Sequence, residues 1–141
     1  MALAGSCLAS ETQLTFPDLF GNWKVRKLVG MAPITAGDLE ERQPLGRTIT
    51  ISAQQIVEPW RQPACRPRHP ALKLVDTKEE LEQNWRVSIS DLDLRKGWNK
   101  PRMQIMDVGC ADALVLDRNN LVWPSGNGFY YLAIRQRNTG P

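Results

Sequence analysis

Glycine and proline interrupt this chain so often that most of it cannot form long helices. Its 141 residues include ten Gly and ten Pro, and the apolar runs between them have the length of β-strands. This pattern favours a mostly β, antiparallel domain. A chain of this length buries one hydrophobic core. We therefore expect one domain at 16–137, between a flexible segment at 1–15 and a short tail at 138–141.

The strand candidates follow one another closely along the chain. Residues 47–51 alternate apolar and polar side chains, which is typical of a strand with one buried face. The other candidates lie at 23–29, 54–58, 72–75, 101–110, 113–116, 121–123 and 129–135. Asn127-Gly128 predicts a type I′ hairpin turn before the last of them. Consecutive strands joined by short turns predict an antiparallel meander that closes into a small barrel.

One short helix is expected at about 77–86. Thr77 and Glu80 have the spacing of a capping box, in which the first residue caps the helix. Leu81 and Trp85 are four residues apart and would share one face of this helix. The long segment between the first two strands could hold a further helical turn at 39–42.

The three cysteines allow one disulfide and one unpaired thiol. Cys65 lies in a proline-rich loop, and Cys110 ends the apolar segment 103–110. We predict a disulfide between these two, because it would attach an irregular loop to a strand of the core. Two reduced thiols in a cytoplasmic protein are the alternative. Cys7 would remain unpaired, and its role as a lipid-attachment cysteine is a further alternative.

The first residues favour export. Small residues alternate at positions 2–4, ahead of a polar segment, as they do at the end of a signal peptide. An ordinary disordered N-terminus is the alternative. No run approaches the roughly 18 apolar residues that cross a bilayer. We expect a soluble protein of the periplasm or the extracellular medium.

Several classes of function lack their residues. The net charge of +3 is spread along the chain, which disfavours a nucleic-acid surface. The single histidine, His69, lies between Arg68 and Pro70 with no nucleophile at a recognisable spacing. One histidine and no paired cysteines also disfavour a zinc site, and no glycine-rich phosphate loop is present. We expect no catalytic residues, no metal and no cofactor.

Two ends of the chain carry a family resemblance. Gly21-Asn22-Trp23, preceded by Phe20, resembles the first signature of the lipocalins, and Arg135 lies on the last expected strand. The resemblance implies a lipocalin-like barrel in which Arg135 stacks on the indole of Trp23. The Cys65 and Cys110 pair is also similar to that of small exported lipocalin-like proteins of bacteria.

Two segments combine tryptophan with cations. The first is the proline-stiffened loop that carries Trp60, Arg61, Arg66, Arg68 and His69. Such rigid aromatic and arginine surfaces are typical of interface hot spots. Trp98 lies in the second segment, among the cations of 95–102. Both would suit an acidic partner. The alternative is that the prolines merely route a connection across the barrel end, with solvated arginines.

These features together indicate a noncatalytic, exported binding protein. Our leading hypothesis is a protein-binding inhibitor or immunity-type factor of the bacterial periplasm, which blocks an acidic secreted or cell-wall-directed enzyme. The alternative is a lipocalin-like carrier of a small apolar ligand. For the carrier, the expected ligand residues in the barrel interior are Val25, Ile49, Ile51, Met103, Ile105 and Tyr131.

Overall fold

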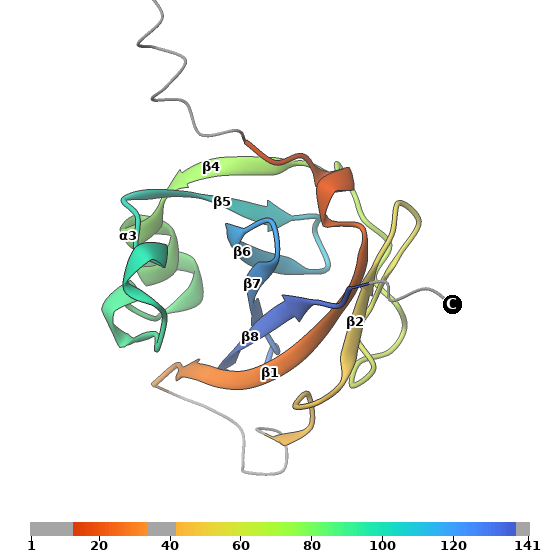
Figure 1. The fold of residues 1–141 in the computed structure, drawn as a ribbon, viewed down its shortest axis with the longest axis horizontal. Coiled ribbons are helices and arrows are strands. Elements are labelled where there is room, and N and C mark those ends of the chain that lie inside the picture. Colours follow the sequence, from red (N-terminus) through yellow and green to blue (C-terminus); the bar gives the residue numbers. More distant parts are fainter. Residues whose placement is uncertain (1–12, 34–41, 138–141) are drawn as a thin grey trace, which may run out of the picture.

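Eight antiparallel strands form one curled sheet in the computed structural model, which describes residues 13–33 and 42–137 (Figure 1). The strands are β1 (Gly21–Met31), β2 (Thr48–Ile51), β3 (Ile56–Val57), β4 (Leu72–Asp76), β5 (Arg102–Asp107), β6 (Asp112–Asp117), β7 (Asn120–Pro124) and β8 (Phe129–Arg135). The predicted mostly β, antiparallel architecture is thereby confirmed. The predictions for Cys7, for the rest of segment 1–12 and for a helical turn at 39–41 concern residues outside this description.

The sheet is a half-barrel rather than the closed barrel that we expected. Its strand order is β3-β2-β1-β8-β7-β6-β5-β4, so β3 and β4 are the two edges. The first and last strands pair with each other from Trp23 opposite Arg135 to Met31 opposite Phe129, with two register shifts between these ends. The chain between the edges, 58–71, is irregular and carries the predicted Cys65–Cys110 disulfide, which is present.

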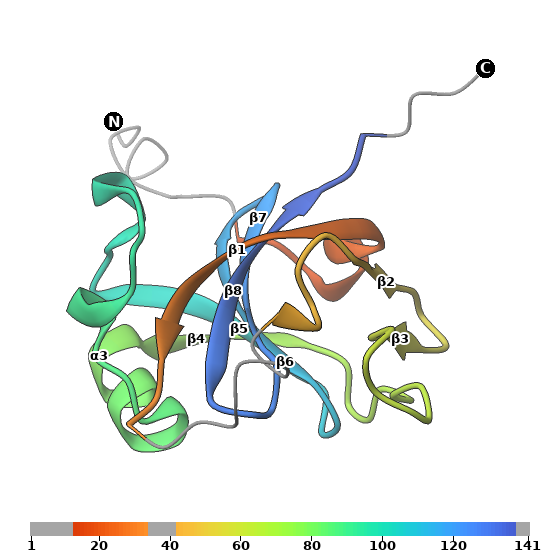
Figure 2. The same ribbon diagram turned by 90° about the horizontal axis from the view of Figure 1, so that it is seen from below.

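Both faces of the sheet are covered. The inner core cluster includes Trp23, Ile49, Ile51, Trp123 and Tyr131, and the 3-10 turn η1 (Phe16–Leu19), which leads into β1, packs in it. The outer core cluster packs beneath a helical segment at 77–98. This segment consists of α3 (Thr77–Glu80), the π-helical turn η2 (Leu81–Trp85) and the 3-10 turns η3 (Ile89–Asp91) and η4 (Lys96–Trp98). Figures 1 and 2 show this segment at one side of the molecule, and strands β2 and β3 at the opposite side.

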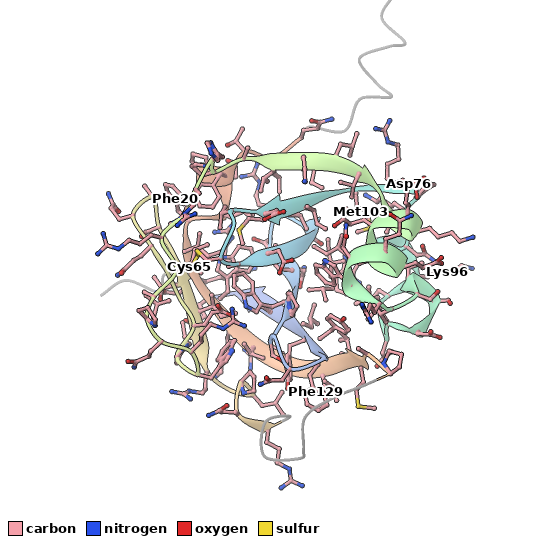
Figure 3. The ribbon with its side chains drawn as sticks, turned by 180° about the vertical axis from the view of Figure 1, so that it is seen from behind. Phe20, Cys65, Asp76, Lys96, Met103 and Phe129 are labelled. Carbon is pink, nitrogen blue, oxygen red and sulfur yellow. A yellow bond between two sulfur atoms is a disulfide. The ribbon has the colours of Figure 1, made fainter. Side chains whose placement is uncertain are left out.

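The two-sided burial corrects the expected barrel interior. Val25, Ile49, Ile51 and Tyr131 belong to the inner cluster, whereas Met103 and Ile105 belong to the outer one. Figure 3 shows Met103 on the side of the helical segment, away from Cys65. The six side chains therefore do not line one cavity. The physical reason is that neighbouring residues of a strand point to opposite faces, and both faces are buried here.

The predicted helix is present, but its cap differs from the prediction. Asp76 is the N-cap, and its carboxylate accepts a hydrogen bond from the backbone N–H of Glu79. Thr77 is instead the first helical residue and is buried. Leu81 and Trp85 both enter the outer cluster, as their spacing predicted. Trp85 also stacks on Tyr130 of β8, with ring centroids 5.5 Å apart.

The turn between β7 and β8 is not the predicted type I′ turn. That turn needs positive φ at both central residues, and Asn127 does not have it. Gly126 and Gly128 have φ of 93° and 90°, and the Ser125 hydroxyl accepts a hydrogen bond from the N–H of Asn127. Two glycines around an ordinary residue thus make a longer loop, in place of the tight two-residue turn.

The contact that the lipocalin resemblance implied between Trp23 and Arg135 is present. The guanidinium carbon of Arg135 lies 4.3 Å from the centroid of the Trp23 ring. The same guanidinium donates hydrogen bonds to the backbone carbonyls of Asp18, Phe20 and Arg118. Arg135 therefore joins the end of β8 to the turn that precedes β1 and to the β6–β7 turn.

Candidate binding site

The loop between the two edge strands, residues 58–71, is fixed to both sides of the gap that it crosses; we call it the stapled loop. Toward β3, Ile56 and Cys65 exchange two backbone hydrogen bonds of 2.8 and 2.9 Å. Toward β5, Cys65 is bonded to Cys110, and the N–H of Arg68 donates to the carbonyl of Val108 at 2.8 Å. The loop is therefore held in one conformation, although it has little regular structure.

Trp60 and Arg61 attach the stapled loop to the rest of the fold, which the sequence did not predict, although the Arg61 side chain is 40% exposed. Trp60 is half-buried and packs against the inner cluster. Arg61 donates to the carbonyl of Ser125 in the β7–β8 turn at 2.9 Å. A Cβ atom at Gly126 would collide with the Arg61 guanidinium, so glycine leaves room for this contact. Both side chains thus have structural roles.

Arg66, Arg68 and His69 form the outward surface of the stapled loop. All three residues are exposed. His69 has φ of 49°, in the left-handed region that few residues other than glycine adopt. The carbon chain of Arg68 lies along Gly109, 3.7–4.0 Å from the position of a Cβ there. The loop therefore presents a cationic surface on a fixed backbone.

Trp98, the remaining predicted contact residue, does not join this surface. It is 8% exposed, and its indole N–H donates to the Asp117 carboxylate at 3.1 Å. Arg95 covers its ring at 4.4 Å. Asp117 ends β6, whereas Asp112 beside the stapled loop begins it, and these ends are roughly 16 Å apart along a strand. The two tryptophan and cation segments are separate features.

A pocket of about 210 Å³ lies where the stapled loop meets the β5–β6 and β7–β8 turns. We call it the acidic pocket, since three carboxylates and one cation are among its lining side chains. The residues that matter for its chemistry are Glu58, Arg61, Asp107, Cys110, Asp112 and Gly126.

Glu58 is the most enclosed of the three carboxylates. Its side chain is 3% exposed, and Oε2 accepts a 2.7 Å hydrogen bond from the indole N–H of Trp123. Oε1 has no hydrogen-bond partner among the described residues, and the nearest cation, Arg61 Nη1, lies 3.6 Å away. Burial raises the pKa of the Glu58 carboxyl, and the Trp123 hydrogen bond and the Arg61 charge oppose this shift.

Asp112 is held among like charges. It pairs directly across the β5–β6 hairpin with Asp107. Burial, followed by the charges of Asp107, Glu58 and Glu80, raises the pKa of Asp112 from 3.8 to about 6, and only Arg61 opposes the shift. Carboxylates with raised pKa values in a pocket are typical of functional sites, because stability alone would not favour them.

Asp112→Asn is expected to stabilise the protein by about 1–2 kcal/mol above pH 6. The wild-type carboxyl has a higher pKa folded than unfolded, so its ionisation lowers stability as pH rises from about 4 to about 6. Each pKa unit corresponds to about 1.4 kcal/mol, and partial exposure screens part of the shift. Urea unfolding of both proteins between about pH 4 and pH 8 measures the difference.

The matched control for this prediction is Asp93→Asn. Asp93 is 79% exposed at the side chain, and its carboxylate pairs with Lys27 at 3.4 Å. Its substitution is expected to change stability by less than about 0.5 kcal/mol. A gain for Asp112→Asn that is the same at both ends of the pH range would show that ionisation is not its cause.

Sequence reasoning did not find the acidic pocket. Its carboxylates lie on segments separated by about fifty positions, and none belongs to a motif with a recognisable spacing. The one local signal was the pair of aspartates that flank the turn containing Gly109 and Cys110. Two like charges opposite each other on a hairpin are unfavourable, so their presence in the sequence could have drawn attention to this turn.

The fold and site define a mostly β domain with a disulfide-fixed loop, and comparison with known proteins adds no relative to this description. Neither the protein-family models nor the curated proteins nor the solved structures contain a match to this chain. Within the described residues, no group of three or more His, Cys, Asp or Glu side chains is placed to hold a metal ion. No helix in that part of the chain is long and apolar enough to cross a membrane.

Proposed function

We propose that this chain is a noncatalytic, exported binding protein of bacteria, and that it inhibits a partner enzyme in the periplasm by docking the stapled loop on it. The observation that carries the proposal is the fixation of this loop on both sides, with Arg66, Arg68 and His69 exposed on it. A loop that is already ordered loses little conformational entropy on binding. Its cations would meet acidic groups on the partner.

The packing of the inner cluster supports an inhibitor over a carrier of a small apolar ligand. The side chains at its centre, including Trp23, Ile49 and Tyr131, are each 0% exposed. They fill the concave face of the half-barrel, where a carrier would hold its ligand. The disulfide also fits the oxidising compartment that the proposal requires.

Charge reversal on the stapled loop tests the proposal. Arg66→Glu with Arg68→Glu is expected to weaken the complex with the captured partner at least about 100-fold, because two attractive contacts become repulsive. The control, Arg26→Glu with Arg137→Glu, makes the same charge change at exposed positions in β1 and just after β8, outside both tryptophan and cation segments. It is expected to change affinity by less than about threefold. Binding is measured by surface plasmon resonance with the partner purified from the host's extracytoplasmic fraction.

Two results would contradict this role of the loop. One is an equal loss of affinity in the two double variants, which would reflect net charge alone. The other is an unchanged affinity in the Arg66 and Arg68 variant, which would place the contact surface elsewhere. Circular dichroism of each variant verifies that the fold is retained, as we expect for substitutions at exposed positions.

A further inference from the structure

The acidic pocket opens beside the exposed arginines of the stapled loop, and its charge is opposite to theirs. Three carboxylates line it, from Glu58, Asp107 and Asp112, against the single guanidinium of Arg61. Lys73 does not line the pocket, and its exposed ammonium group lies 4.0 Å from Asp107. When all these carboxylates are ionised, the lining alone carries a net charge of about −2. An entering cation would therefore be attracted.

The buried Glu58 carboxylate gives this charge a specific acceptor. Glu58 is only 3% exposed, and its Oε1 atom lacks a hydrogen-bond donor within the described part of the chain. Arg61 Nη1 forms an ion pair with Oε1 at 3.6 Å, a distance too long for a hydrogen bond, and Arg61 Nη2 donates to the Ser125 carbonyl. A buried carboxylate oxygen without a donor is costly. A ligand that brings N–H groups into the pocket would remove this cost.

We propose that the acidic pocket receives one lysine or arginine side chain of the partner protein. The proposal rests on the proposed function and adds the partner's chemistry to it. At about 210 Å³ the pocket is smaller than most sites for whole small-molecule ligands, but it has room for the end of one side chain. Gly109 lines the pocket, and the carbon chain of Arg68 lies against Gly109. The pocket is therefore continuous with the outward surface of the stapled loop.

The partner surface that fits is therefore a basic side chain flanked by acidic ones. The basic side chain enters the pocket, and the acidic groups face the loop cations. Binding to the pocket also requires ionised carboxylates. Asp112 faces Asp107 across the hairpin, Glu58 and Arg61 on the stapled loop, and Glu80 and Tyr130 from the elements packed behind it. Affinity for a cation is expected to fall as the pH is lowered through about 6.

Capped amino acids test the pocket without the partner. The full chain is titrated at about pH 8 with N-acetyl-arginine methylamide, N-acetyl-lysine methylamide, the neutral N-acetyl-citrulline methylamide and spermidine. Amide and indole NMR signals are followed, since the Trp123 indole N–H contacts Glu58 directly. We expect saturable, millimolar binding of a basic probe at Gly109, Gly126 and the Trp123 indole, at least about tenfold tighter than for citrulline.

Two variants test whether the basic probe binds in the acidic pocket. Asp112→Asn, and separately Glu58→Gln, are expected to weaken the basic probe at least about fivefold, whereas the control Asp93→Asn leaves it unchanged. The amide of Glu58→Gln keeps an oxygen that can accept from the Trp123 indole, so this variant removes charge with little loss of packing. Lowering the pH to about 5 is expected to weaken binding by a similar factor.

Several results would overturn the pocket proposal. They are the absence of saturable binding up to about 50 mM, citrulline binding as tightly as arginine, and affinity that does not depend on Asp112 or Glu58. Spermidine binding more than about tenfold tighter than both amino acids would assign the pocket to a free polyamine instead. Failure of the probes alongside a complex that depends on Arg66 and Arg68 would remove the pocket and leave the proposed function intact. Probe binding without a complex that depends on Arg66 and Arg68 would contradict the proposed function and leave the pocket as a site for cations.

Discussion

Replacement of Cys65 and Cys110 by serine is expected to lower the free energy of unfolding by about 4 kcal/mol. The disulfide joins positions 45 residues apart, and closing a loop of that length restricts the unfolded chain by about this amount. The same bond fixes the stapled loop to the β5–β6 turn through Cys110, whereas backbone hydrogen bonds between Cys65 and Ile56 fix the loop to β3. Guanidinium unfolding of the variant and the wild type measures the loss.

A reductant provides the control for this prediction. It is expected to destabilise the wild-type protein by a similar amount and to leave the double serine variant unchanged. The stapled loop should also gain backbone mobility, which hydrogen exchange at Arg68 reports through its bond to Val108. Equal stability of the variant and the oxidised wild type would mean that the loop is held by its other contacts alone.

Arg135→Ala is expected to cost about 3 kcal/mol, because removing the guanidinium leaves carbonyl groups without donors and removes a cation–π contact. The guanidinium donates to the carbonyls of Asp18, Phe20 and Arg118, and it covers the ring of Trp23. These contacts lie at one end of the pairing of β1 with β8, which joins the two halves of the sheet. Urea unfolding measures the change in free energy.

Arg135→Lys separates the charge from the geometry of the guanidinium. Lysine keeps the positive charge over Trp23, but a single ammonium group cannot reach three carbonyls in different directions. It should recover less than about half of the loss seen with alanine. A stability of Arg135→Ala within about 0.5 kcal/mol of the wild type would show that this corner does not hold the half-barrel together.

The sequence predicted the elements better than their arrangement. The strand candidates and the helix depend on local residue patterns, the disulfide was predicted from the number and setting of the cysteines, and all are present. The prediction of a closed barrel was wrong, because strand count and turn length do not determine whether the two edge strands of a sheet pair with each other. A better signal was available in 113–116 and 129–133, where continuous apolar runs indicate strands that are covered on both faces.

The candidate site was predictable only in its most local part. The prolines and Cys65 indicated a rigid loop, but residue type alone cannot distinguish an exposed tryptophan or arginine from an anchoring one. Trp60 and Arg61 became anchors because distant groups, the inner cluster and the Ser125 carbonyl, receive them. The acidic pocket likewise depends on three turns that meet only in the folded chain.

A native mass spectrum of the protein, taken from the extracytoplasmic fraction of its host, tests the central proposal most directly. We predict a complex with a second protein in a fixed ratio, and its loss in the variant that carries Arg66→Glu and Arg68→Glu. A tightly held small apolar adduct, with no second protein, would contradict the inhibitor and assign the concave face of the sheet to a carrier.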